Sequence, residues 1–429
     1  MLHAGFHVAD ISPPVGASIP GGFAPRPGGG IHDPLEVRAG VFIGEDSSLA
    51  LVGVDAVSLK TEDVNRAREL AAALSPIPAE AIIVAASHTH SGGPANDVLG
   101  TSSDEHYREH IVRQIASAVA EAARDAVPAE VGWASGRAEG LAWNRRWWLA
   151  DGSQGTHCDP ADEDVIERAG PDDPELLLLA ARDLDGYPLG FVGNFTCHVT
   201  VMGGPDFSAD YPGAWSDLME AATGAPLVFF NGAMGDLTQV NPELDLPQKG
   251  AEGVQRLGRA LAGESLKLLA DMQFTEAPEI ASASEILQAD FRHPTAEQLE
   301  RDRETVAQAA DDDYSREAVF ARERVALAEH IEAVGQEPCH LIAARIGELA
   351  IASGPGQMFC EFGLDCKARS PFEQTMYVSI ANGNAGYVPT PAAISTGGYE
   401  PTLCRGSKLA PETGGQMVDA QVQLLQQLT

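Results

Sequence analysis

The stretch AIIVAASHTHSGGP, residues 81–94, joins an apolar run to a polar loop that carries two histidines. A short apolar, β-branched run bounded by Gly and Pro is typical of a buried strand. In an extended segment, residues i and i+2 point to the same side, so His88 and His90 can face one ion or one substrate. The alternative is a pair of hydrogen-bonded structural histidines, and the stretch by itself leaves both interpretations open.

Similar strand-to-loop junctions recur along the chain, and helical segments separate them. Apolar runs at 189–197 (LGFVGNFTC) and 225–232 (APLVFFNG) end in polar loops, and residues 39–57 read as a strand pair around the turn EDSS. Helical patterns cover 62–74 and 107–126. This alternation predicts an α/β fold, with a mixed β-sheet core flanked by helices. Because ligands of such sheets bind beyond the strand ends, the polar side chains there are candidates for one common site.

Residues 294–335 interrupt the alternation with a charged, helical sequence that breaks near DDDY, residues 311–314. We expect a helical hairpin inserted into the α/β body, with its charges on a solvated face. No linker or repeat marks a boundary, so residues 1–429 are expected to form one domain that includes this insertion.

Composition limits the classes of partner. The chain has 62 acidic and 28 basic residues, a formal net charge of −34, which disfavours binding to a phosphate backbone. No apolar run approaches 18 residues, so integral membrane association is not expected. The N-terminal sequence MLHAGFHVADISPP lacks the pattern of a secretory signal, and the six cysteines are scattered. A small-molecule substrate and a cytoplasmic location, with reduced thiols, are the expectations.

Several motifs in order resemble the N-terminal catalytic domain of the neutral/alkaline ceramidase family. They are GFHVADISPPVG, IHDPLEVRAGVF, ASHTHSGGP, WNRR, FTCH, SADYPG, NGAMGDLT, GPGQMFCEFG and AGYVPT followed by GGYE. The resemblance implies a zinc-dependent amidohydrolase. Enzymes of this family commonly carry a further β-sandwich domain, which we do not expect in this chain.

The resemblance also implies a set of metal ligands. His88 and His198 match the zinc-binding histidines, and Tyr387 matches the tyrosine that completes the shell. The family motif that supplies a carboxylate ligand reads GPGQ here, which puts Gln357 in its place. A neutral amide is a weaker zinc ligand, and Glu361, four residues later, could reach the same face if a helix begins there.

Five catalytic residues follow from the same resemblance: His90, Arg145, Asp236, Thr238 and Tyr399. The histidine holds substrate and oxyanion, and the tyrosine lies near the reaction centre. The arginine approaches the site, although its neighbour Arg146 fits the motif nearly as well. Thr238 stands where the family has a serine near the scissile amide. The aspartate matches the motif's acidic residue, and the other interpretation is that it caps the turn after NGAMG.

Three functions remain open at this point. The first is a metal-dependent hydrolase of a C–N bond in a small, soluble N-acylated amine or sugar rather than ceramide, because no apolar groove for a lipid is legible. The second is a glycoside hydrolase or lyase that uses two strand-end carboxylates about 5 to 9 Å apart. Its candidates are Asp33, Asp55, Asp210, Asp236 and Glu361. The third is a non-catalytic binding protein, against which the joint presence of the histidines and tyrosines argues.

Overall fold

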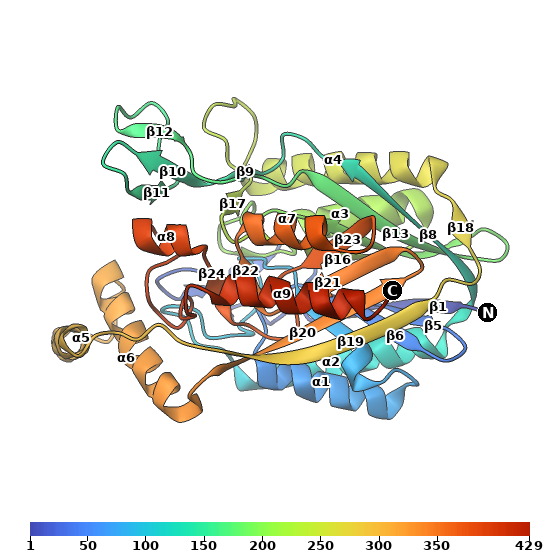
Figure 1. Ribbon diagram of the computed structural model, residues 1–429, viewed down its shortest axis with the longest axis horizontal. Coiled ribbons are helices and arrows are strands. Elements are labelled where there is room, and N and C mark those ends of the chain that lie inside the picture. Colours follow the sequence, from blue (N-terminus) through green and yellow to red (C-terminus); the bar gives the residue numbers. More distant parts are fainter.

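The computed structural model describes all 429 residues, Met1–Thr429, and confirms a mixed α/β fold with helices around a β core (Figure 1). The large sheet has nine strands. In spatial order they are β16 (Leu227–Asn231), β14 (Pro188–Phe195), β13 (Glu175–Asp183), β8 (Val127–Arg137), β1 (His3–Asp10), β5 (Glu36–Ile43), β6 (Ser48–Val54) and β7 (Ile82–Ala86), with β18 (Phe274–Thr275) beside β8. Two neighbouring pairs are parallel, β6–β7 and β14–β16, and the others are antiparallel.

A smaller sheet of four strands completes the β core. It consists of β19 (Ile280–Ala289), β20 (Glu337–Ile346), β21 (Leu349–Ser353) and β23 (Gln374–Val378). One apolar cluster, which includes Leu51, Leu177, Phe230 and Ile351, joins this sheet to both halves of the large one. The inward-facing side chains of the two sheets therefore form a shared central core.

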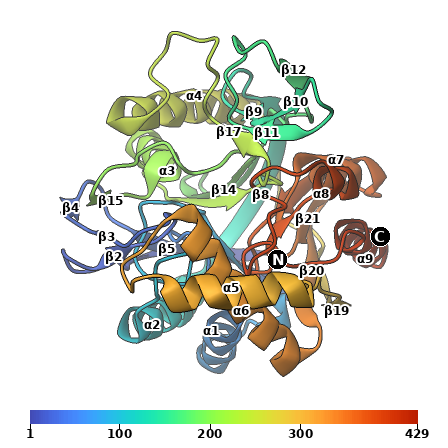
Figure 2. The ribbon, with the colours of Figure 1, turned by 90° about the vertical axis from the view of Figure 1, so that its left-hand side faces the viewer.

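Three pairs of helices cover the outer faces (Figure 2). They are α1 (Thr61–Leu74) with α2 (Glu105–Arg124), α3 (Asp210–Thr223) with α4 (Gly250–Asp271), and α7 (Cys360–Arg369) with α9 (Thr413–Gln426). Each pair buries its apolar stripe against one part of the β core, in a separate cluster. None of the helices combines the length and the hydrophobicity that crossing a bilayer requires.

Alternation along the strands explains these layers. In β13, Leu176 and Leu178 face α3 and α4, whereas Leu177 and Leu179 face the central core. Both faces of such a strand are buried, so the sequence reads as a continuous apolar run instead of an alternating one. A one-residue shift in register would exchange the two faces and lose both sets of contacts.

The insertion forms the expected hairpin, from α5 (Ala296–Gln308) and α6 (Arg316–Val334). Its charges are not all solvated, which corrects the expectation from sequence. Glu323 is only 4% exposed and forms an ion pair with Arg405, and Asp302 is 5% exposed and pairs with Arg324. Carboxylates buried to this extent need such partners. The Asp302–Arg324 pair joins the two helices of the hairpin, and the Glu323–Arg405 pair joins the hairpin to the body.

The polar ends of several strands meet at one point of the molecule, where Asn231 ends β16. Its side-chain amide donates to the carbonyl oxygens of Ser87 and Cys197, which follow β7 and β14, at 3.3 and 2.9 Å. The carbonyl of Asn231 accepts from the backbone N–H of Ser379, just after β23, at 2.9 Å. This one residue therefore holds together the strand ends that carry His88 and His198.

Candidate metal centre and active-site cavities

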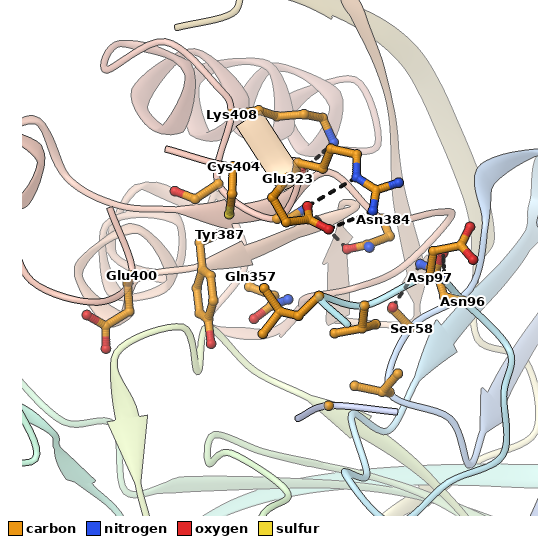
Figure 3. A pocket seen from close by; sticks show the side chains of 18 of the residues that line it. Ser58, Asn96, Asp97, Glu323, Gln357, Asn384, Tyr387, Glu400, Cys404 and Lys408 are labelled. Atoms are coloured by element: carbon orange, nitrogen blue, oxygen red, sulfur yellow. Dashed lines mark hydrogen bonds and ion pairs between the residues drawn. The ribbon is translucent and has the colours of Figure 1, made fainter. Parts of the chain in front are cut away.

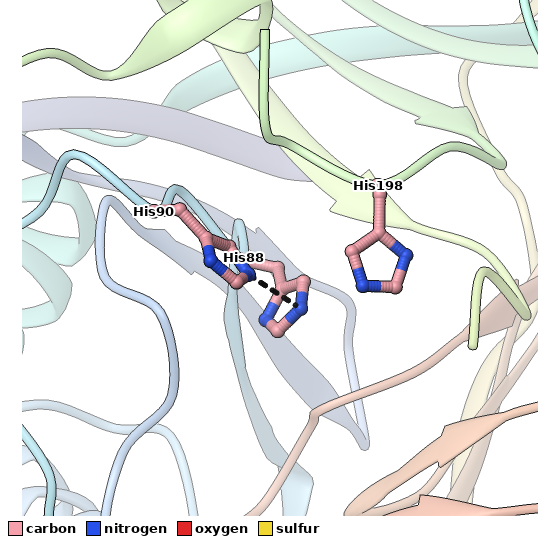
Figure 4. A group of neighbouring side chains, drawn as sticks. All are labelled: His88, His90 and His198. Carbon is pink, nitrogen blue, oxygen red and sulfur yellow. Dashed lines mark hydrogen bonds between the residues drawn. The ribbon is translucent and has the colours of Figure 1, made fainter. Parts of the chain in front are cut away.

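Three histidines gather where these strand ends meet (Figure 4). One ring nitrogen each of His88, His90 and His198 lies within 4.8 Å of the others, and the Nε2 atoms of His88 and His90 are 3.2 Å apart. His88 and His198 are 2% and 1% exposed. His88 also has a positive φ of 73°, a conformation that non-glycine residues adopt at a cost and that occurs often at functional sites.

Backbone carbonyls determine which nitrogen of each ring carries the proton. The Nδ1 atoms of His88, His198 and His90 lie 2.7, 2.8 and 3.3 Å from the carbonyl oxygens of Val57, Met234 and Gly21. A carbonyl oxygen only accepts hydrogen bonds, so each Nδ1 donates and each neutral ring keeps a lone pair on Nε2. Second partners of this kind orient the histidine ligands of metal sites.

Burial keeps the three rings neutral. It lowers the pKa of His90 to about 4 and those of His88 and His198 well below the ordinary value. Neighbouring positive charge, from Arg145 in all three cases, lowers the pKa values further. Neutral imidazoles with free Nε2 lone pairs are the form in which histidine binds zinc and other transition metals.

Tyr387 and Arg145 extend the cluster. The hydroxyl of Tyr387 lies 3.4 Å from His198 Nε2 and accepts a hydrogen bond from Arg145 Nη2 at 3.1 Å. Tyr399 is next to it, with ring centroids 6.2 Å apart. The structure thus brings Arg145 to the tyrosine and the histidines, whereas Arg146 points to Gln154 and the carbonyl of Gly397 instead.

Glu400, which sequence reasoning missed, holds both arginines. It is fully buried, and its two carboxylate oxygens accept from Arg145 Nε at 2.7 Å and Arg146 Nη1 at 2.6 Å. Burial alone would raise its pKa, but the two guanidinium charges lower it below the ordinary value. The signal in the sequence was its place beside Tyr399 in GGYE, opposite the arginine pair of WNRR.

Gln357 faces the cavity that His88 and His90 also line (Figure 3). It lies on β22 (Gly356–Met358), which runs parallel to β24 (Gly386–Val388) with Gln357 opposite Tyr387. Its side-chain oxygen is buried and has no hydrogen-bond partner. Glu361 is exposed in the first turn of α7 and does not line the cavity, so the structure does not bring it to the site as a substitute.

Asp236 does not line either of the two cavities beside the histidines, and its catalytic role stays a prediction. Its carboxylate accepts from Asn144 Nδ2 at 2.7 Å and from the backbone N–H of Cys360, the first residue of α7, at 2.8 Å. It therefore stabilises the start of α7. This is a capping role, but at the helix α7 and not at the turn after NGAMG. Thr238, on β17 (Leu237–Thr238), does line a cavity together with His198.

The other strand-end acids also accept hydrogen bonds from groups within the protein. Asp33 accepts from Ser208 and from the Ala209 N–H, and Asp55 accepts from Arg38. Asp210 accepts three backbone N–H groups. None of these three acids lines the two cavities that the histidines share. The paired carboxylates expected of a glycoside hydrolase are therefore not found among these candidates.

Two cavities adjoin the histidines, and His90, Tyr387 and Tyr399 line both. The first, of about 270 Å³, also contains His88 and Gln357 and extends beneath the insertion, which contributes Phe320, Glu323 and His330. Only 7 of its 28 lining residues are hydrophobic, and paired charged side chains form part of its wall. The second, of about 490 Å³, contains Arg145, His198 and Thr238.

Known structures share this architecture. The crystal structure of neutral ceramidase from Pseudomonas aeruginosa superposes with a TM-score of 0.77 and 18% sequence identity, over 100% of this chain and 74% of that one. A ceramidase complexed with C2 gives a TM-score of 0.75, also at 18% identity, over 100% of this chain and 75% of that one. No protein-family model matches the chain, and no curated protein matches it in sequence. The family resemblance read from the motifs is thus confirmed at the level of the fold, and the chain has the neutral ceramidase fold in a strongly divergent sequence.

Proposed function

We propose that the protein is a metal-dependent hydrolase that cleaves the amide bond of a small, polar N-acylated substrate. The observation that carries this proposal is the convergence of three imidazoles whose Nδ1 atoms all face backbone carbonyls. Two Nε2 lone pairs only 3.2 Å apart, at His88 and His90, repel each other unless a proton or a cation lies between them. Because burial disfavours the proton, a metal cation fits the donor set best.

The donor set also suggests which metal. Imidazole nitrogens with an oxygen ligand and an open position are typical of catalytic zinc. His88, His90 and His198 would hold the ion with Tyr387 as its oxygen ligand, and the unpartnered oxygen of Gln357 is available as a neutral ligand. When bound, such an ion polarises a carbonyl group and makes a water molecule more acidic.

The remaining side chains supply the rest of an amide hydrolysis. Arg145 is held by Glu400 and by the Gly235 carbonyl, so its guanidinium is oriented before substrate arrives. From there it donates to Tyr387, and this places positive charge where an oxyanion develops. Tyr399 lines both cavities, which puts it in reach of a substrate that spans the two, and its hydroxyl can move a proton to the leaving amine.

Charged side chains in the wall argue for a substrate other than a long-chain lipid. An acyl chain laid against them would remove charged groups from water, and that cost offsets the gain from burying apolar area. In the first cavity, ion pairs of Lys60 with Asp97 and of Arg405 with Glu323 form part of the lining. We infer that hydroxyl, carbonyl or charged groups of a compact substrate meet this wall.

Metal content and turnover test the proposal together. We expect about one zinc per chain in the purified protein, and we expect a chelator to remove the zinc together with hydrolysis of a panel of N-acetylated amines. His88→Ala and His198→Ala should each lose both, whereas His110→Ala, an exposed histidine on α2, should lose neither. Wild-type metal content and turnover in both site variants would contradict the proposal.

A further inference from the structure

The second cavity differs from the first in its charges. In the first, the cations pair with acids of the same wall: Lys60 with Asp97, Arg405 with Glu323 and Lys408 with Glu337. The second contains Arg168 and Lys249, and neither has a carboxylate oxygen within 4.0 Å. Both cations line the cavity that also contains His90 and His198.

Contacts within the protein hold Arg168 in place, but only some of its hydrogen-bond donors have an acceptor. It ends β12 (Val165–Arg168), stacks over the Trp147 ring at 4.4 Å and donates from Nη2 to Asn241 Oδ1 at 3.2 Å. Its Nη1 donates to the carbonyl oxygen of Asn144. These are two of the five N–H donors of a guanidinium group, so three stay without a protein acceptor.

Other charged groups lie near this pair. Glu243 and Asp172 attract the Arg168 charge from beyond 4.0 Å, and neither lines the cavity. Arg145 lines the same cavity, but its charge is balanced by Glu400. Asp159 is the single carboxylate in the wall. Lys249 is exposed just before α4, on the rim. Among the residues that line this cavity, Arg168 and Lys249 therefore face a single carboxylate, Asp159.

We infer that the second cavity binds a carboxylate of the substrate, which makes the substrate an N-acylated amino acid or a similar amide acid. This inference rests on the proposed function and specifies the substrate class of that site. The carboxylate would accept from the free N–H donors of Arg168, whose planar fork matches a carboxylate, with Lys249 as a second point charge. Because His90 lines this cavity too, the amide of the same molecule can reach the histidines.

A matched pair of probes tests the inference at equilibrium. N-methanesulfonyl-leucine carries the carboxylate, N-methanesulfonyl-isoamylamine lacks it, and neither has an amide bond to cleave. Calorimetry on the protein as purified should show the acid binding at least about tenfold more tightly, as charge-assisted hydrogen bonds predict. Arg168→Gln should abolish this preference, and Lys249→Gln should reduce it. Arg303→Gln, an exposed arginine on α5 without an ion-pair partner, should leave it unchanged.

The outcome separates this inference from the proposed function. Three results would overturn the carboxylate site. The first is equal affinity for the two probes, and the second is an unchanged preference in Arg168→Gln. The third is no binding of either probe when it is present at ten times the highest protein concentration that calorimetry allows. Hydrolysis of N-acetyl-isoamylamine, the neutral amide, is measured alongside and reports on the proposed function alone. Its persistence in Arg168→Gln would also show that the variant keeps its fold and its reaction centre.

Discussion

Glu400→Gln removes one negative charge from between two buried guanidinium groups and keeps the size of the side chain. In the native protein, the carboxylate accepts from Arg145 and Arg146 at 2.7 and 2.6 Å and also from the Thr156 hydroxyl at 2.9 Å. A glutamine can offer one oxygen, and its NH2 group must then face a donor. At least one arginine therefore loses its partner inside the protein.

The magnitude follows from these contacts. At an effective dielectric constant of 20, two unit charges about 4 Å apart attract by about 4 kcal/mol, so two pairs amount to about 8 kcal/mol before desolvation. The cost of burying three charged groups offsets part of this gain, and removing one partner of a buried pair costs about 3 to 5 kcal/mol in practice. We expect a loss of that size in the free energy of unfolding.

Urea denaturation at pH 7 measures this loss, and Glu130→Gln is the matched control. Glu130 also pairs with an arginine, Arg182, at 2.6 Å, but the two side chains are 20% and 38% exposed. Pairs in contact with water contribute about 0 to 1 kcal/mol, so the control should differ little from the wild type.

The pH dependence gives a second check on Glu400. Its pKa is lowered in the folded state, because the attraction of the two arginines outweighs burial. The stability that this group contributes is fully present above its unfolded pKa of about 4.5 and is lost as the pH falls through the folded pKa. A loss below 1 kcal/mol at pH 7, or a loss that grows as the pH is lowered, would refute the reasoning.

Three further variants test the site. Gln357→Glu should raise zinc affinity by at least about tenfold through the added negative charge. Competition with a chromophoric chelator measures this affinity, and an unchanged value would show that residue 357 does not face the ion. Gly21→Ala should lower kcat/KM by more than about tenfold, because its Cβ would lie 2.6 Å from His90 Nδ1 at a φ of 99°. Gly16→Ala is the control, because residue 16 has a similar φ of 96° but open space around it, so this variant carries only the backbone strain. Burial raises the pKa of Asp236 to about 6. The free energy of unfolding of the wild type relative to Asp236→Asn should therefore fall by up to about 3 kcal/mol as the pH rises from 4 to 6. We expect the variant to retain kcat, and a hundredfold loss of kcat would instead support the catalytic role.

The secondary structure was largely readable from local patterns. Apolar runs bounded by Gly and Pro located β7, β14 and β16, and amphipathic repeats located α1 and α2, because strand and helix periodicity are properties of neighbouring residues. The sequence did not reveal that a second sheet faces the first. That arrangement depends on contacts such as Leu177 with the core shared by β21 and β23, which lie more than 150 residues away.

The histidines of the site were visible from their motifs, but their state was not. HxH spacing and a third histidine indicate a possible metal site, whereas the carbonyls of Val57, Met234 and Gly21 that fix the tautomers come from three separate loops. Glu400 was overlooked because a buried carboxylate between two arginines is recognisable only when the arginines are seen.

Two candidate residues lie away from the cavities for the same reason. Asp236 stands in a motif beside reactive positions, yet its side chain accepts from the first residue of α7. Glu361 comes four residues after Gln357, but Gln357 lies on β22 and Glu361 is exposed in the first turn of α7. Spacing along the chain determines which face of a local element a residue occupies, but not what lies opposite that face. The sequence by itself therefore determined the elements, their order and the residue types available for metal and amide chemistry. Only the tertiary structure decided which of those side chains share a cavity, because burial, hydrogen-bond partners and the balance of charge arise from segments that meet only in the folded chain.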